Sequence, residues 1–234
     1  MITAAARTGT AGARARRARL ALRLVVALLS VAAAARAEDR LVAEILEERG
    51  EFSCLTPEES ALLNSLNEYR ADNRLPRVPL SRSLTKVARL HAVDLVENRP
   101  ERRTDSRGRA CNLHSWSDTG FWSPVCYTGD QRNLRRMLDK PREITRRAYG
   151  DIAYENVYWT SAAEVYSPRV LDTWRKSPSH NALILEIGGW QGSDWSALGV
   201  GIYRNVAVMW LGSAADPLGQ LKACEPAEGR EALP

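Results

Sequence analysis

The segment LDTWRKSPSHNALIL, residues 171–185, predicts a helix that ends and then begins again. Apolar residues recur at helical spacing up to Trp174 and give the first piece an apolar face. Pro178 cannot continue that helix, and Ser179 can cap the next turn. The interruption places His180 at a helix start beside a bend, where its side chain can point into a cleft.

Two further helices are predicted upstream. TPEE at residues 56–59 combines a threonine cap, a proline at the first helical position and a glutamate that completes a capping box. The helix it starts should end near Asn73, and a second helix is predicted over residues 81–98. His91 lies on the apolar stripe of the second helix, and a histidine so placed is more often a hydrogen-bonded core residue than a ligand.

Three strands complete the expected elements. Residues 152–160, IAYENVYWT, form a β-branched and aromatic run, and residues 197–202 and 206–211 read as two strands joined by a tight turn. The order helix, helix, strand, helix, strand, strand is typical of helices covering an antiparallel sheet. The predicted fold class is therefore α+β.

The first 37 residues have the features of a secretory signal peptide. A basic lead precedes an apolar run over residues 24–35, and Ala-Arg-Ala at 35–37 is a small-x-small cleavage site. An uncleaved membrane anchor is disfavoured because a span needs about 20 apolar residues. The sequence thus predicts a secreted or periplasmic protein with no transmembrane segment after the signal is removed.

Removal of this leader changes the net charge. Seven of the 33 basic residues lie in it and no acidic residue does, so 26 basic and 28 acidic side chains remain. The net charge falls from +5 to −2. A chain of that charge gives no support to nucleic-acid binding.

Four cysteines lie in the remaining chain. An even count in an exported protein indicates two disulfides with three possible pairings. Closeness in sequence favours Cys111–Cys126, which leaves Cys54–Cys224. A zinc site made of cysteines is disfavoured, because no CxxC spacing occurs.

These features divide the chain into four parts. Residues 1–37 are the signal peptide, and 38–53 form a flanking helical segment. The domain follows over residues 54–224, with a C-terminal tail at 225–234.

Three side chains stand out as a candidate site: His114 in the loop between two cysteines, Glu155 in a strand, and His180 at the helix break. Two neutral imidazoles and a carboxylate are ligands that a divalent transition ion uses with a position open for water. Alternatively, Glu155 hydrogen-bonds one imidazole and fixes its tautomer. Spacing alone does not say that the three residues meet, and scattered polar residues satisfied locally are the plainer interpretation.

An ordered set of motifs nevertheless resembles a known family. NSLNEYRADNRLPRVPLSRSLTKVARLHAVDL, HSWS, YEN, WRKSPSHNALIL and LGVGIYRNVAVMW occur in this order between residues 57 and 211. Together they resemble the CAP superfamily of cysteine-rich secretory, antigen-five and pathogenesis-related proteins, and its bacterial SCP-domain members. The resemblance implies a three-layer α-β-α sandwich with a central antiparallel sheet and a cleft at one end.

The resemblance also implies site residues. The family's cleft gathers two histidines and two acidic residues, and some members hold a divalent ion on the histidines. The histidines correspond to His114 and His180, and one acidic residue corresponds to Glu155, although Tyr154 stands where glycine is usual. The other acidic position falls on Ser177, so any zinc bound here should be held more weakly.

Tryptophans add to the picture of a cleft. Trp174 and Trp210 are expected in the core, by their place on a helix face and in a strand. Four loop tryptophans can line a groove or act as packing lids: Trp116, Trp122, Trp190 and Trp195.

Three functions follow as hypotheses. The preferred one is a secreted module that binds a lipid, glycan or peptide in or beside the cleft. The alternative is a metal-dependent hydrolase, with an ion on His114 and His180 and Glu155 as general base. The third is an interaction protein whose cleft residues only stabilise the fold. No nucleophile motif such as G-x-S-x-G occurs, so the sequence gives little support to an enzyme and assigns no catalytic residue.

Overall fold

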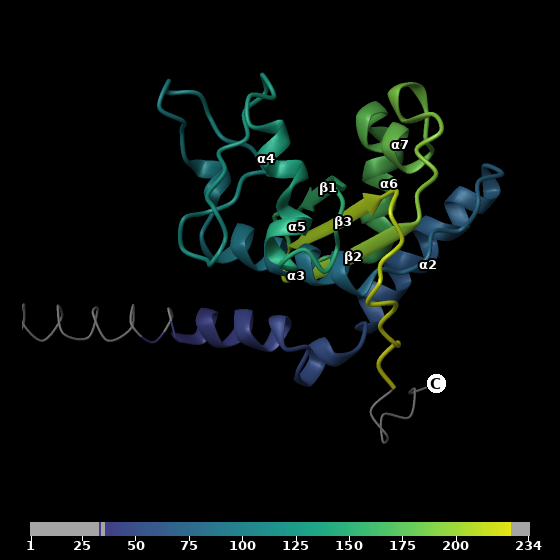
Figure 1. Ribbon diagram of the computed structural model, residues 1–234, viewed down its shortest axis with the longest axis horizontal. Helices are drawn as coiled ribbons and strands as arrows, with labels where there is room; N and C mark the ends of the chain where they lie inside the picture. Colours follow the sequence, from purple (N-terminus) through teal and green to yellow (C-terminus); the bar gives the residue numbers. More distant parts are fainter. Residues whose placement is uncertain (1–32, 34–35, 226–234) are drawn as a thin grey trace, which may run out of the picture. The chain divides into compact units, whose positions relative to one another are not determined.

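The computed structural model describes residue 33 and residues 36–225 (Figure 1). The chain divides into two compact units, residues 1–43 and 44–234. Nearly all of the expected signal peptide, and residues 226–234 of the tail, lie outside the described residues. Residues 36–46 are helical. None of the described helices is both long and apolar enough to span a membrane.

The second unit begins before the first cysteine. Ile45 and Phe52 are buried, and Glu48 accepts a hydrogen bond from Arg82. A 3₁₀ turn, η1, spans Gly50–Ser53. Residues 44–53 of the segment expected to flank the domain therefore belong to this unit, and Ile45 and Phe52 contribute to its core.

The two expected helices form with the predicted caps. Helix α2 spans Pro57–Asp72, and Thr56 and Glu59 make the reciprocal hydrogen bonds of a capping box. Helix α3 spans Arg82–Glu97, and the Ser81 side chain caps it by accepting from the Leu84 amide. Both caps satisfy amide groups that the first turn of a helix leaves without partners.

Three antiparallel strands form the sheet. Strand β1 spans Tyr154–Trp159, β2 spans Ala197–Tyr203 and β3 spans Val206–Gly212, in the spatial order β1-β3-β2. Tyr203 pairs with Val206, so the β2–β3 turn consists of two residues. Arg204 in this turn has a φ of 48°, the sign that such tight hairpin turns need.

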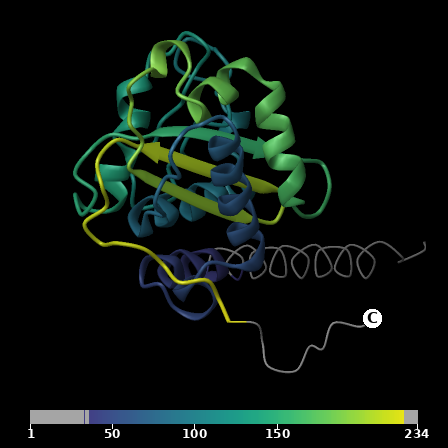
Figure 2. The same ribbon diagram turned by 90° about the vertical axis from the view of Figure 1, so that its right-hand side faces the viewer.

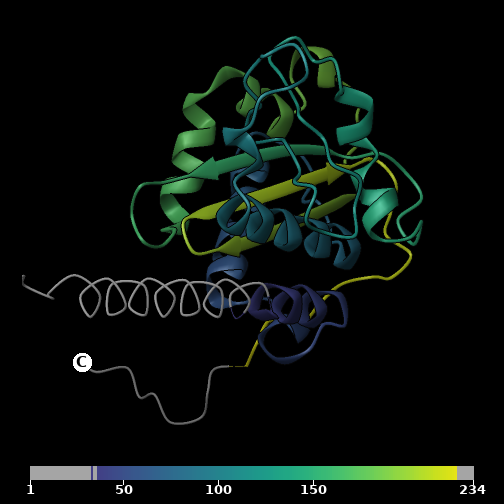
Figure 3. The same cartoon turned by 90° about the vertical axis from the view of Figure 1, so that its left-hand side faces the viewer.

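Helices cover both faces of the sheet. Gly199 and Gly201 face α3 so closely that an added Cβ would lie 2.1 Å from the Leu84 carbonyl carbon and 2.3 Å from the Arg89 amide nitrogen. The intervening β2 residues, Leu198 and Val200, belong to the core on the opposite face. Figure 2 shows α2 and α6 in front of the sheet, and Figure 3 shows α3 against its other face. The α+β fold with a sheet between helices, expected from the sequence, is confirmed.

The interrupted helix forms with one correction. Helix α6 spans Ser167–Lys176, and α7 spans Pro178–Ile184. Ser177, with extended backbone, is the residue before α7, and Ser179 lies inside the helix instead of capping it. Proline suits the first helical position because its missing N–H has no partner there. His180 is therefore the third residue of α7.

Short elements connect the larger ones. Helix α4 spans Leu134–Leu138, and α5 spans Lys140–Ile144. Two more 3₁₀ turns are η2 at Pro100–Arg102 and η3 at Gly188–Trp190.

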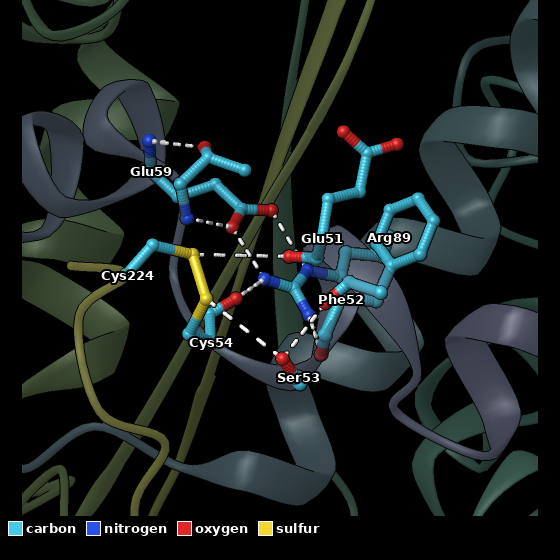
Figure 4. The surroundings of a disulfide bond; sticks show 9 residues. Glu51, Phe52, Ser53, Cys54, Glu59, Arg89 and Cys224 are labelled. Atoms are coloured by element: carbon cyan, nitrogen blue, oxygen red, sulfur yellow. Dashed lines mark hydrogen bonds and ion pairs between the residues drawn. A yellow bond between two sulfur atoms is a disulfide. The ribbon is translucent and has the colours of Figure 1, made fainter. Parts of the chain in front are cut away.

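The disulfides join Cys111 to Cys126 and Cys54 to Cys224, the pairing that closeness in sequence favoured. Beside the second bond, buried Arg89 of α3 makes a two-point ion pair with Glu59 of α2 (Figure 4), with nitrogen–oxygen distances of 2.9 and 2.6 Å. Arg89 also donates to the carbonyl oxygens of Phe52 and Cys54. One arginine thus fastens both helices to the segment that carries the disulfide.

Candidate functional site

A pocket of about 360 Å³ lies where β1, α4, α7 and the disulfide-closed loop meet. The sequence-predicted residues His114, Glu155 and His180 all line it. Its other lining residues are Tyr127, Gln131, Leu134, Met137, Leu138, Tyr154, Asn156, Ser179, Leu183 and Trp190.

Glu155 lies beneath the pocket and is bound on both sides. It occupies β1 opposite Trp210 of β3, and its side chain has no exposed surface. Its Oε1 is 2.5 Å from Nδ1 of His91, and its Oε2 is 2.8 Å from Nδ1 of His114. Burial alone would raise the pKa of Glu155, but the charge of His91 and the hydrogen bonds from His114 and His91 lower it below the ordinary value.

His91 is a buried cation. Its Nδ1 faces Glu155, and its Nε2 lies 3.0 Å from the carbonyl oxygen of Ser115. Both partners only accept hydrogen bonds, so both ring nitrogens must carry protons. Burial opposes the charge, but Glu155 outweighs it and raises the pKa of His91. The ring also stacks on Trp116, with ring centroids 4.2 Å apart.

His91 is the site residue whose role the sequence did not reveal. The prediction that it is a hydrogen-bonded core residue is confirmed, because its side chain is buried and both ring nitrogens are bonded. Its partner, however, is the carboxylate of the candidate site, 64 positions further along the chain. Helical spacing placed His91 on an apolar face and contained no signal for that pairing.

His114 connects this buried pair to the pocket. The loop holds it through its backbone amide, which donates to Oδ1 of Asn112. Because Nδ1 faces an acceptor-only carboxylate oxygen, Nδ1 carries the proton and Nε2 is not used by Glu155. The side chain is 23% exposed, so Nε2 is the ring nitrogen available to a ligand.

His180 contributes the second imidazole of the pocket wall. Asn156 of β1 donates to its backbone carbonyl at 3.1 Å, which ties α7 to the sheet. Its Nδ1 is buried and has no hydrogen-bond partner in the described part of the chain. Burial, and next the charge of His114, lower the pKa of His180 below 6.5, so the ring is neutral at pH 7.

Ser177 lies apart from the pocket lining. Its hydroxyl is 3.4 Å from that of Ser179, and Ser179 is the serine that lines the pocket. Ser179 lines the pocket instead of Ser177 because α7 begins one residue after Ser177.

The loop tryptophans divide between the two expected roles. Trp116, Trp122 and Trp195 are buried and act in packing, and Trp195 also donates to the Leu183 carbonyl. Trp190 lines the pocket and makes an edge contact with Tyr154, with ring centroids 4.5 Å apart. Trp174 and Trp210 are in the core, as predicted.

The donor set suits a metal ion only in part. Within the described residues, no group of three or more His, Cys, Asp or Glu side chains is arranged to hold a metal ion. Both oxygens of Glu155 are within hydrogen-bond distance of imidazoles. Glu155 therefore supports His114 and is not itself placed as a metal ligand. A carboxylate in that position orients an imidazole and makes it more basic.

A comparison of the sequence with protein-family models found no match, and a comparison with curated protein sequences found none either. Solved structures that the chain resembles include a cysteine-rich secretory protein from Staphylococcus aureus, with 18% identity and a TM-score of 0.40. That match covers 67% of this chain and 39% of the other.

Two further solved structures have TM-scores of 0.39 and 18% identity. One is an outer surface protein from Borrelia burgdorferi, matched over 70% of this chain and 93% of its own length. The other is an extracellular protein containing an SCP domain from Bacillus anthracis, matched over 66% and 39%. This chain thus spans 39% of the length of the Staphylococcus and Bacillus proteins. The chain is similar to these proteins, and its ordered motifs resemble those of the CAP superfamily.

Proposed function

We propose that this chain is an exported domain of the CAP superfamily that binds a small amphipathic ligand in the pocket between β1, α4 and α7. The ordered motifs support the family, and the two disulfides fit an oxidising compartment outside the cytoplasm. The pocket is within the size range of small-molecule sites, about 300–1,000 Å³.

The mixed lining of the pocket carries the proposal. Four of the lining side chains are apolar: Leu134, Met137, Leu138 and Leu183. His114 and His180 offer hydrogen-bonding nitrogens, and Trp190 and the tyrosines add flat surfaces. Such a lining suits a molecule with an apolar body and one polar group, such as a lipid or a sugar with an apolar substituent. A peptide with one apolar side chain has the same character.

Calorimetric titration of the full chain with short-chain fatty acids, glycosides and short peptides tests this proposal. We expect saturable binding of at least one class, weakened about tenfold by Trp190→Ala, because a stacking and burial surface is lost. Trp159→Ala is the matched control, since Trp159 is 54% exposed and does not line this pocket. Equal weakening by both substitutions, or no saturable binding of any class, would refute the proposal.

A divalent ion, with zinc as the first choice, remains part of the proposal as a weak occupant. Nε2 of His114 and the imidazole of His180 would hold it, and a bound ion would supply a Lewis acid. Two protein ligands predict lower affinity than the three or four of an ordinary zinc site. Zinc titration of the wild type and of His114→Ala/His180→Ala checks this, and uptake unchanged by the double substitution would dispose of the site.

The positions of the two imidazoles favour binding over the hydrolase alternative, in which Glu155 is the general base. A base must reach the water it activates, and both oxygens of Glu155 already accept hydrogen bonds from imidazoles. We therefore place Glu155 in a positioning role. Hydrolysis of a peptide or ester panel that is abolished by Glu155→Ala would overturn this preference for binding.

A further inference from the structure

A second pocket, of about 350 Å³, lies beyond the other side of α4. The binding pocket uses Leu134, Met137 and Leu138 of this helix, whereas the second pocket is lined by Arg136. Its other lining residues come from the segment after α4 and from the disulfide-closed loop, and they are Ser123, Val125, Asp139, Lys140, Arg142, Glu143 and Arg147.

The second pocket is positively charged. Its lining contains four basic and two acidic side chains, a formal charge of +2. Residues 132–147 as a whole contain six arginines and one lysine against two acidic residues, in a chain whose charge after the leader is −2. The excess of positive charge is therefore local to this segment, because the chain as a whole is not basic once the leader is removed.

The acidic residues of the pocket are already paired. Glu143 accepts from the Lys140 ammonium at 2.6 Å and from the Ser123 amide at 2.5 Å. Asp139 accepts from Arg142 at 2.8 Å. These pairs leave two cations of the lining without a partner, since neither Arg136 nor Arg147 has an acidic partner within ion-pair distance in the described residues.

Lys140 is a buried cation of the lining, paired with Glu143. Its side chain has no exposed surface and also donates to the Ser123 carbonyl. Arg136 is close enough to contribute, after burial, to a lowered pKa of Lys140. An anion between Arg136 and Arg147 would relieve this repulsion, and guanidinium groups bind tetrahedral oxoanions through two parallel hydrogen bonds.

We propose that this pocket, which Arg142 also lines, binds a phosphate or sulfate group through Arg136 and Arg147. The group can belong to a free ion or to the headgroup of an anionic lipid, which share this chemistry. The proposal is independent of the ligand in the His114 pocket.

Isothermal titration calorimetry of the full chain with inorganic phosphate, and separately with sulfate, tests this proposal. We expect saturable binding by the wild type at or below about 10 mM, weakened about tenfold or more in Arg136→Gln/Arg147→Gln. The control is Arg132→Gln/Arg135→Gln, which removes the same charge from exposed arginines outside the pocket and should change the affinity by less than about twofold. Equal loss in both pairs, or no saturable binding of either ion, would overturn the proposal.

For a third variant we expect a higher affinity for phosphate, a result that misfolding would not produce. Asp139→Asn removes one of the two carboxylates that pair with Arg142, the other being Asp151 at 3.4 Å, and should tighten phosphate binding by about two- to fivefold. Unchanged or weaker binding in this variant would count against the site.

Sedimentation with phosphatidylglycerol vesicles, and with phosphatidylcholine vesicles as reference, separates the two sources of the group. Binding to the anionic vesicles that is lost in Arg136→Gln/Arg147→Gln identifies a headgroup. Phosphate binding without vesicle binding identifies a soluble oxoanion, and either result supports the pocket. If both double substitutions weaken vesicle binding equally, the attraction comes from the overall surface charge and not from this pocket. That result would overturn the proposal.

Discussion

At the scale of single residues, the site depends on one carboxylate shared by two imidazoles. Glu155 holds His91 as a buried cation on one side and orients His114 toward the pocket on the other. Motif resemblance indicated His114, Glu155 and His180, and all three line one pocket. It did not indicate His91, because a pairing between a helix and a strand 64 residues apart leaves no trace in local periodicity.

Glu155→Gln should lower the free energy of unfolding by about 3 kcal/mol or more, because it leaves the His91 cation buried without a counterion. Urea denaturation at pH 6 measures the change. Glu164→Gln, an exposed carboxylate, should stay within about 0.5 kcal/mol of the wild type. A loss no larger than that of the control would show that His91 and Glu155 are not an ion pair.

The same pair predicts a pH dependence. The raised pKa of His91 adds stability that is complete below pH 6.5 and is lost as the pH rises through the folded-state pKa. The lowered pKa of Glu155 adds stability that is present above pH 4.5 and is lost as the pH falls. The stability difference between wild type and His91→Gln should therefore be largest between pH 4.5 and 6.5. A difference that increases steadily above pH 6.5 in urea denaturation would contradict this assignment.

At the scale of elements, the sequence predicted most of the helix and strand boundaries but little of how these elements pack against one another. Thr56, Glu59 and Ser81 cap their helices through neighbours in sequence, so those helix starts were predictable. The start of α7 was placed wrongly, because Pro178 begins the helix and the preceding Ser177 takes the position expected for Ser179. The contact of α3 with β2 depends on Gly199 and Gly201. The sequence alone does not show why these positions need glycine, because the reason is the closeness of the α3 backbone.

Gly201→Ala should destabilise the protein by about 1–3 kcal/mol, because the new methyl group would overlap the α3 backbone. Thermal denaturation followed by circular dichroism measures the loss. Gly129→Ala is the matched control: an added Cβ meets no atom within 4 Å and the backbone needs no positive φ. Equal melting temperatures for the two variants would mean that α3 does not lie as close to β2 as described.

At the scale of the whole molecule, two disulfides close loops of very different size. Cys54–Cys224 spans 170 positions, and Cys111–Cys126 spans 15. The short bond closes the loop that carries His114, whereas the long one holds the C-terminal segment beside Arg89. Counting cysteines predicted two bonds, and only the closeness of two of them in sequence suggested the partners.

Removal of the long disulfide by Cys54→Ser/Cys224→Ser should cost about 5 kcal/mol, against about 3 kcal/mol for Cys111→Ser/Cys126→Ser, because loop-closure entropy increases with loop length. Guanidinium denaturation of the two variants gives the comparison. A larger loss from the short bond would show that His114 loop packing, and not chain entropy, dominates its contribution.

The most direct test of the account uses the fact that the chain has only three histidines. A long-range proton–nitrogen spectrum of ¹⁵N-labelled protein at pH 7 reports the protonation of each ring. We expect His91 to have protons on both nitrogens and His180 to be neutral, with one unprotonated nitrogen. A neutral His91 or a doubly protonated His180 at that pH would contradict the shared-carboxylate arrangement on which the pocket is built.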